Sequence, residues 1–161
     1  MARGVQISVI GAGQGEQEIL RDAEEVGRRL AEAGAVLVCG GRTGVMEAAS
    51  RGAAEAGGTV VGILPTLSAS DANPYVTVAV ATGIGEARNL AVVASGAAVI
   101  AVGGEWGTLS EIAYARKLGR PVVAIQSWAL RNRSGTDLGI LEAGSAEEAV
   151  SAALGAARSQ P

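Results

Sequence analysis

Short apolar runs alternate with amphipathic segments along most of the chain. The runs are rich in Val, Ile, Leu and Ala and predict strands over residues 5–10, 35–39, 59–64, 75–80, 99–102 and 122–126. The segments between them have helical periodicity and predict helices over residues 16–33, 45–56, 86–95 and 108–118. This alternation predicts an α/β fold with a doubly wound parallel sheet, whose ligand sites lie at the carboxyl ends of the strands.

The C-terminal part of the chain is less regular. Segment 127–139 is polar and without clear periodicity, which predicts a loop, and we expect a short edge strand after it. Ser145 and Glu148 form a capping-box pattern that predicts a last helix up to about Ala157, and the tail over 158–161 is expected to fray. The chain has 161 residues, of which 48% are hydrophobic, so we expect one domain over residues 1–161.

Composition and charge narrow the classes of partner. Aromatic residues make up 2% of the chain and Phe is absent, so the core must be aliphatic, as is typical of parallel sheets. The net charge of −3 disfavours non-specific binding to nucleic acids or anionic membranes, and a small ligand is the expected partner. One Cys and no His exclude ordinary Cys/His zinc sites and a histidine base, and no metal site is predicted.

The sequence has neither a signal-peptide pattern nor a membrane-spanning pattern. Gln6 and Ser8 interrupt the apolar segment near the N-terminus that a signal peptide would need. The longest apolar run, over residues 90–102, is shorter than the roughly 20 residues that cross a bilayer. We therefore expect a cytoplasmic protein without a membrane partner.

The most informative stretch runs from Val99 to Glu111. It predicts a buried strand, a tight loop over residues 103–107 and a helix from Thr108 onward. Such a junction directs unpaired backbone N–H groups and the positive end of a helix dipole at an anion above the strand end. We interpret Glu111 as a reactive carboxylate at this site. The alternative is that Thr108 and Glu111 form a capping box, in which Glu111 has no chemical role.

Two further glycine loops follow predicted strands. The loop over residues 11–15 resembles a dinucleotide fingerprint, but its third glycine comes one position early and the next strand ends without an acidic residue for a ribose. This favours a packing turn, or another kind of nucleotide contact, over NAD binding. The loop over residues 40–44 could bring Arg42 and Thr43 to an anion, or Thr43 could be a plain N-cap with Arg42 in solvent. It lacks the lysine of a P-loop.

Two stretches together resemble the Lonely Guy superfamily, whose members were formerly labelled lysine decarboxylases. They are Gly-Ile-Gly-Glu-Ala-Arg-Asn over residues 83–89 and Gly-Gly-Glu-Trp-Gly-Thr-Leu-Ser-Glu over residues 103–111. Their wording is most similar to the branch that contains the molybdenum cofactor carrier proteins. The resemblance implies a Rossmann-like fold, a homodimer or higher homo-oligomer, and a phosphate site at Gly107 and Thr108. A lysine decarboxylase is not supported, because Lys117 is the only lysine and has no cofactor-attachment context.

The resemblance implies two functions for the same site. In the first, Arg88 and Glu111 are the catalytic pair of a phosphoribohydrolase that cleaves the N-glycosidic bond of a nucleoside 5′-monophosphate, releasing base and ribose 5-phosphate without a required cofactor. In the second, the protein is a noncatalytic carrier of a phosphorylated pterin such as molybdenum cofactor. The residues expected to contact the phosphate or nucleotide are Gly11, Gly13, Gly41, Arg42, Thr43, Gly44, Gly103, Gly104, Gly107 and Thr108.

Within residues 103–111 the chain departs from the hydrolase motif at three positions, and Glu86-Ala87 replaces the Met-His that often precedes the catalytic arginine. Gly103 replaces the proline of the motif, Glu105 replaces its second glycine, and Ser110 replaces the acid that commonly precedes the catalytic glutamate. The carboxylate of Glu105 stands beside the predicted phosphate site. It is expected to weaken anion binding unless it points away.

Overall fold

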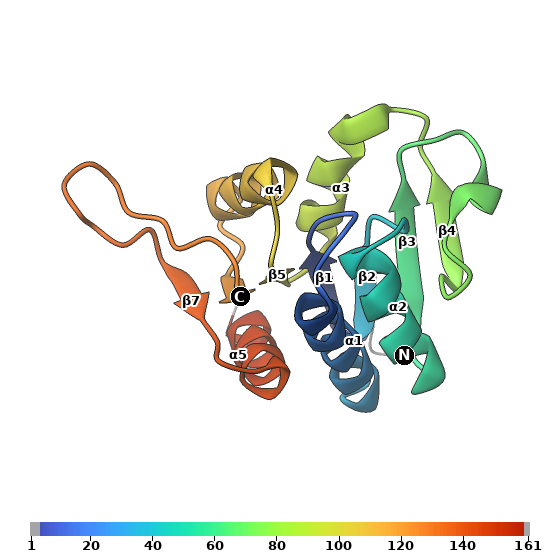
Figure 1. Ribbon diagram of the computed structural model, residues 1–161, viewed down its shortest axis with the longest axis horizontal. Helices are drawn as coiled ribbons and strands as arrows, with labels where there is room; N and C mark the ends of the chain where they lie inside the picture. Colours follow the sequence, from blue (N-terminus) through green and yellow to red (C-terminus); the bar gives the residue numbers. More distant parts are fainter. Residues whose placement is uncertain (1–3, 160–161) are drawn as a thin grey trace.

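The computed structural model describes residues 4–159, which form a seven-stranded sheet in the order β4-β3-β2-β1-β5-β6-β7 (Figure 1). All six adjacent strand pairs are parallel. The strands are β1 (Gln6–Ile10), β2 (Val36–Cys39), β3 (Val60–Leu64), β4 (Val78–Ala81), β5 (Ala98–Val102), β6 (Val122–Ile125) and β7 (Ile140–Glu142). The helices are α1 (Gln17–Glu32), α2 (Val45–Glu55), α3 (Arg88–Ser95), α4 (Trp106–Lys117) and α5 (Ala146–Arg158). The predicted doubly wound parallel sheet is confirmed.

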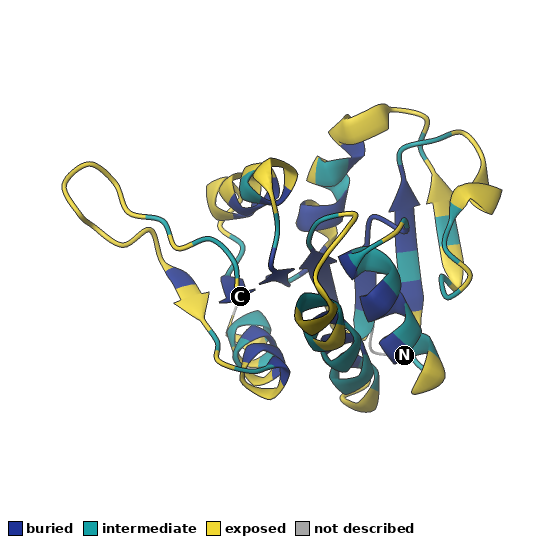
Figure 2. Cartoon of the chain, viewed as in Figure 1, coloured by how far each residue is buried: buried dark blue, intermediate teal, exposed yellow. Residues whose placement is uncertain are grey.

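The sheet lies between two layers of helices. Helices α1, α2 and α5 pack on one face around a core that includes Val26, Leu37 and Ile100, and α3 and α4 pack on the other around Val93 and Ile112. Figure 2 shows the central strands buried and the loop over residues 127–139 exposed. The buried hydrophobic residues of the described chain are Val, Ile, Leu, Ala and one Cys, as the composition predicts.

The strand order reverses between β1 and β5. The chain continues from β1 through β2 to β4 on one side of the sheet, and from β5 through β6 to β7 on the other. Such a switch point leaves a crevice at the carboxyl ends of the two strands, and ligands of open α/β sheets bind there. The glycine loops after β1 and β5 both open into this crevice.

The start of β4 and the end of α5 differ slightly from their predicted positions. β4 begins at Val78 rather than residue 75, because Asn73 forms a turn in which its Oδ1 accepts a hydrogen bond from the Tyr75 N–H at 3.1 Å. α5 includes Arg158, so the predicted fraying does not begin there, while residues 160–161 lie outside the described residues. The predicted N-cap of α5 is confirmed, since Ser145 Oγ accepts from the Glu148 N–H.

None of the helices within residues 4–159 is both long and apolar enough to span a bilayer. The segment over residues 127–139 is a projecting loop closed by a bridge between Arg131 and Asp137, and β7 follows it as the edge strand of the sheet (Figure 1).

Helices α1 and α2 approach each other closely at Gly27 and Gly52. A Cβ atom at Gly27 would collide with the carbonyl oxygen of Ala49, and one at Gly52 with that of Glu24. Because backbone atoms cannot turn aside as a side chain can, we expect Gly52→Ala to lower the free energy of unfolding by about 2 kcal/mol, measured by urea denaturation.

The matched control is Gly155→Ala in α5, where an added Cβ meets nothing within 4 Å. Alanine favours helix over glycine by up to ~1 kcal/mol, so this variant should be as stable as the wild type or more stable. Equal losses in the two variants would contradict the close contact of α1 and α2.

Candidate functional site

A cavity of about 240 Å³ opens at the carboxyl ends of β1 and β5. The loop after β1 and the starts of α3 and α4 supply most of its walls, and α2 adds one residue. Its lining residues are Gly11, Ala12, Gly13, Met46, Glu86, Arg88, Asn89, Glu105, Gly107, Thr108 and Glu111. The structure therefore brings Arg88 and Glu111 together with four of the residues predicted to contact a phosphate.

The loop after β1 is both a packing turn and a wall of the cavity. A Cβ atom at Gly11 would lie 2.5 Å from Val45 Cγ1 and 2.7 Å from the carbonyl oxygen of Val102. A glycine is therefore required where this loop passes between α2 and β5. The Thr43 hydroxyl donates to the Gly13 carbonyl at 2.9 Å and ties the loop to its neighbour after β2. The packing-turn interpretation of this motif fits the structure, and the close approach also exposes main chain to the cavity.

Arg88 is the first residue of α3, and its side chain is buried at the cavity. The residue is 8% exposed, and its Nε is buried without a hydrogen-bond partner among the described residues. Its guanidinium fits against Gly40, where a Cβ atom would collide with Nη1. Burial lowers the pKa of Arg88, and the neighbouring Glu111 carboxylate opposes that effect. Because buried polar groups are usually hydrogen-bonded, the Nε without a partner points to a missing acceptor such as an anion.

Glu111 lies on the second turn of α4 and is also 8% exposed. Burial raises the pKa of its carboxyl to about 7, and the charge of Arg88 opposes the rise. The carboxyl therefore changes its ionisation near neutral pH. No ion pair within 4.0 Å joins Arg88 to Glu111 in the described chain, where the recorded pairs involve other residues.

The alternative that Thr108 and Glu111 form a capping box is wrong. The helix begins at Trp106, two residues before the predicted start, and its N-cap is Glu105, whose side chain makes no capping hydrogen bond. Thr108 and Glu111 consequently lie inside the helix, with Thr108 buried. The Glu111 carboxyl is thus not used to cap the helix and faces the cavity instead.

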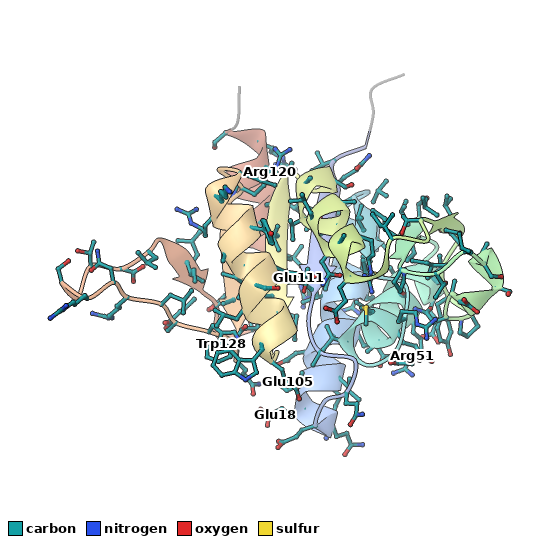
Figure 3. The ribbon with its side chains drawn as sticks, turned by 90° about the horizontal axis from the view of Figure 1, so that it is seen from above. Glu18, Arg51, Glu105, Glu111, Arg120 and Trp128 are labelled. Carbon is teal, nitrogen blue, oxygen red and sulfur yellow. The ribbon has the colours of Figure 1, made fainter. Side chains whose placement is uncertain are left out.

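Glu105 is one of the residues that line the cavity, so its negative charge lies at the site. Figure 3 shows it at the start of α4, with Glu111 further along the helix on the side toward α3. With Glu86, the lining contains three carboxyl groups and one guanidinium group. Within residues 4–159 no group of three or more His, Cys, Asp or Glu residues has a geometry that could hold a metal ion.

Six other residues predicted to contact phosphate lie outside the lining of this cavity. Arg42 and Thr43 line a neighbouring hollow of about 320 Å³ with Asp71 and Asn73, and Arg42 Nη1 donates to the Asp71 carbonyl at 3.4 Å. The alternative that Thr43 is an N-cap is wrong, since the N-cap of α2 is Gly44. The remaining glycines have positive φ angles that shape the two loops; they are Gly41, Gly44, Gly103 and Gly104. Phosphate contacts of these six residues stay a prediction.

Several site residues were not predicted from the sequence. Met46, Glu86 and Asn89 line the cavity, and Gly40 gives the Arg88 guanidinium its space. The role of Gly40 could have been found from the sequence, because two consecutive glycines follow β2 directly. Met46 had no signal beyond its place on a predicted helix.

The two tryptophans meet beside the cavity rather than in its lining. Trp106 is 76% exposed, and its ring centroid lies 5.5 Å from that of Trp128. Trp128 Nε1 donates to the carbonyl oxygen of Glu105 at 3.3 Å and so fixes the start of α4 from the outside (Figure 3).

Comparisons with known proteins agree on one family. The model of the SLOG cluster4 family matches residues 4–153. An uncharacterized protein of Archaeoglobus fulgidus is 47% identical over 122 residues, which cover 76% of this chain and 80% of that protein. The resemblance to the Lonely Guy and carrier-protein superfamily, predicted from the sequence motifs, is confirmed.

Two solved structures are similar over nearly the whole chain. The molybdenum cofactor binding protein of the phototrophic bacterium Rippkaea orientalis is 35% identical with a TM-score of 0.86, covering 96% of this chain and 98% of that one. The Moco carrier protein of Chlamydomonas reinhardtii is 31% identical with a TM-score of 0.84, covering 98% of this chain and 100% of that one. Both share the Rossmann-like fold of this chain.

Proposed function

We propose, since the chain belongs to the SLOG cluster4 family, that it binds a phosphorylated pterin of the molybdenum cofactor type and acts as a carrier of that ligand. The observation that carries the proposal is the buried guanidinium of Arg88, which lines the cavity with an unpartnered Nε. A guanidinium group pairs well with a phosphate, and an anion would supply the partner that this cation lacks.

The start of α4 provides a second attraction for an anion. The first helical hydrogen bond of α4 runs from the Leu109 N–H to the Glu105 carbonyl, so the N–H groups of Trp106, Gly107 and Thr108 have no partner within the helix. Gly107 and Thr108 line the cavity, where these N–H groups and the helix dipole favour a negative charge. This position agrees with the phosphate site expected from the sequence motif.

Two relatives support the pterin rather than another phosphorylated ligand. One is a molybdenum cofactor binding protein and the other a Moco carrier protein, and each matches at least 96% of this chain at more than 30% identity. A carrier needs to bind its cargo without transforming it. The buried cation and the helix start meet that need without a metal or a covalent step.

A second candidate function is favoured by Glu111. A buried carboxyl with a pKa of about 7 can both accept and donate a proton at neutral pH. Beside Arg88, it could stabilise the oxocarbenium-like transition state of N-glycosidic cleavage or activate water. The second candidate is therefore a nucleoside 5′-monophosphate phosphoribohydrolase.

The two candidates are separated by loading and turnover. Purified protein is mixed with molybdenum cofactor released from a molybdoenzyme, passed through a sizing column and assayed for molybdenum and for the oxidised, fluorescent pterin. In parallel, a panel of nucleoside 5′-monophosphates is followed for release of free base. The carrier predicts that molybdenum and pterin co-elute with the protein and that no base is released. Release that disappears in Glu111→Gln, without co-elution, would establish the hydrolase instead.

Ligand affinity should depend on pH through Glu111. Its carboxyl ionises as pH rises through about 7 and adds a negative charge beside Arg88, so affinity for a phosphorylated pterin should fall about tenfold between pH 6 and pH 8. Glu111→Gln keeps position 111 neutral at every pH and therefore reports the contribution of the ligand's own phosphate ionisation. Parallel pH profiles of the two proteins, measured by fluorescence titration, would contradict this role of Glu111.

A further inference from the structure

The charges that line the cavity do not match a simple anion. Glu86, Glu105 and Glu111 line the same cavity as Arg88, so acidic residues outnumber the basic one. A phosphate ion alone would be attracted by one side chain and repelled by the others. A ligand that suits this lining must carry an anionic group and, separately, a group that donates hydrogen bonds to a carboxylate.

Burial gives the cavity a floor and a rim. Arg88 and Glu111 are 8% exposed and form the floor, whereas Glu86 and Glu105 are exposed and form the rim. The anionic group belongs at the floor, where the guanidinium has a buried Nε without a partner. The donor group then lies at the rim. At about 240 Å³ the cavity is smaller than the ~300–1,000 Å³ usual for whole ligands, so a ligand bound at the floor extends to the rim.

Of the two rim carboxylates, Glu105 is the better acceptor for a ligand. The charges of Glu86 and Glu111 raise the pKa of Arg88, so each of these carboxylates already interacts with its guanidinium. The Glu105 side chain makes no capping hydrogen bond, and no ion pair within residues 4–159 includes it. Its backbone is held by the Trp128 indole, which reduces the freedom that a bound ligand would have to remove.

We propose that the Glu105 carboxylate accepts hydrogen bonds from the donor edge of a 2-amino-4-oxopyrimidine ring. Pterins share this ring edge with guanine. In this edge a ring N–H and the adjacent amino group point the same way, and the two oxygens of one carboxylate can accept both hydrogen bonds. This is the bidentate geometry in which charge-assisted hydrogen bonds are strongest. The inference rests on the proposed function and adds to it the part of the ligand that determines specificity.

The test compares two probes that differ in the amino group of this edge and in the proton that its replacement puts on ring N1. 6-Hydroxymethylpterin phosphate has the amino group, and 6-hydroxymethyllumazine phosphate has an oxo group in its place. Dissociation constants are measured by fluorescence titration against wild type, Glu105→Gln and Glu86→Gln. A charge-assisted hydrogen bond is worth ~1.5–3 kcal/mol, so the wild type should prefer the pterin by about tenfold or more.

Glu105→Gln should lose this preference by weakening pterin binding while binding of the lumazine is retained. Glu86→Gln removes the other rim carboxylate and should change both affinities by the same factor, which leaves the preference intact. Circular dichroism melting of each variant checks that it is folded, and Glu105→Asp, which restores the carboxylate, should recover part of the preference.

Three outcomes overturn the inference, and they differ in what they say of the proposed function. Equal affinities of the wild type for the two probes remove the role of Glu105 but leave phosphorylated-pterin binding in place. If Glu105→Gln still prefers the pterin, another residue contacts the donor edge and our assignment of Glu105 is wrong. If the wild type binds neither probe, the inference fails, and absence of cofactor from the sizing-column peak shows separately whether the carrier function fails with it.

Discussion

Arg88→Met should abolish binding of a phosphorylated pterin without unfolding the protein. The guanidinium is the cation at the floor of the cavity, and its removal should weaken binding by at least about 100-fold, or ~2.7 kcal/mol. The fold should not lose stability, since Met keeps much of the apolar stem and removes a buried charge whose Nε has no hydrogen-bond partner. Fluorescence titration measures the affinity and thermal melting measures the stability.

Two other arginine variants test whether the loss of binding is specific to Arg88. Arg133→Met changes an exposed arginine in the loop over residues 127–139 and should leave affinity within about twofold of wild type. Arg42→Met tests the neighbouring hollow, where Arg42 lies beside Asp71. If Arg42→Met abolishes binding and Arg88→Met does not, the anion binds in that hollow and our assignment of the cavity is wrong.

Glu111→Gln should stabilise the protein at alkaline pH and much less at acidic pH. The pKa of Glu111 rises from 4.5 to about 7 on folding, so the folded protein holds this proton more tightly than the unfolded chain. The resulting stabilisation is fully present below pH 4.5 and is lost as pH rises through about 7. A neutral Gln does not lose it, and the stability advantage of the variant should therefore grow by about 2 kcal/mol between pH 5 and pH 8.

Urea denaturation at pH 5, 6, 7 and 8 measures this growth directly. Glu105→Gln is the matched control, because it removes an exposed carboxyl from the same cavity where solvent already stabilises the charge. An advantage of Glu111→Gln that is the same at all four pH values would mean that burial does not hold the Glu111 proton. The assignment of Glu111 as a group that ionises near neutrality would then be wrong.

The fold could be predicted from the sequence because each strand and helix of the sheet repeats one local pattern. Apolar runs such as residues 99–102 end in glycines, and every predicted strand and helix is present with shifts of a few residues. Arg88 could be predicted from the family motif alone, and Glu111 both from that motif and from its place after a predicted strand and loop. Their burial and the absence of an ion pair between them depend on how α3 and α4 pack, which no local pattern specifies.

The start of α4 was predicted two residues too late, because a local sequence pattern does not include contacts from distant segments. Thr108 and Glu111 have the spacing of a capping box, yet the helix extends back to Trp106. Trp106 packs on Trp128, which comes from a segment without periodicity, and the Trp128 indole donates to the Glu105 carbonyl. A tertiary contact from more than 20 residues away therefore sets the helix start. The start of α4 at Trp106 follows from that contact and could not be predicted, whereas the place of Glu105 beside the site was expected from the sequence.

The close contact of α1 and α2 at Gly27 and Gly52 has a consequence for the shape of the cavity. These helices begin directly after the loops that follow β1 and β2, and the Thr43 hydroxyl joins the two loops at Gly13. One wall of the cavity is therefore carried by one rigid unit of two helices and two loops, and the opposite wall by α3 and α4. A substitution that disturbs the contact of α1 and α2 should therefore also shift the wall of the cavity that contains Gly11 and Gly13.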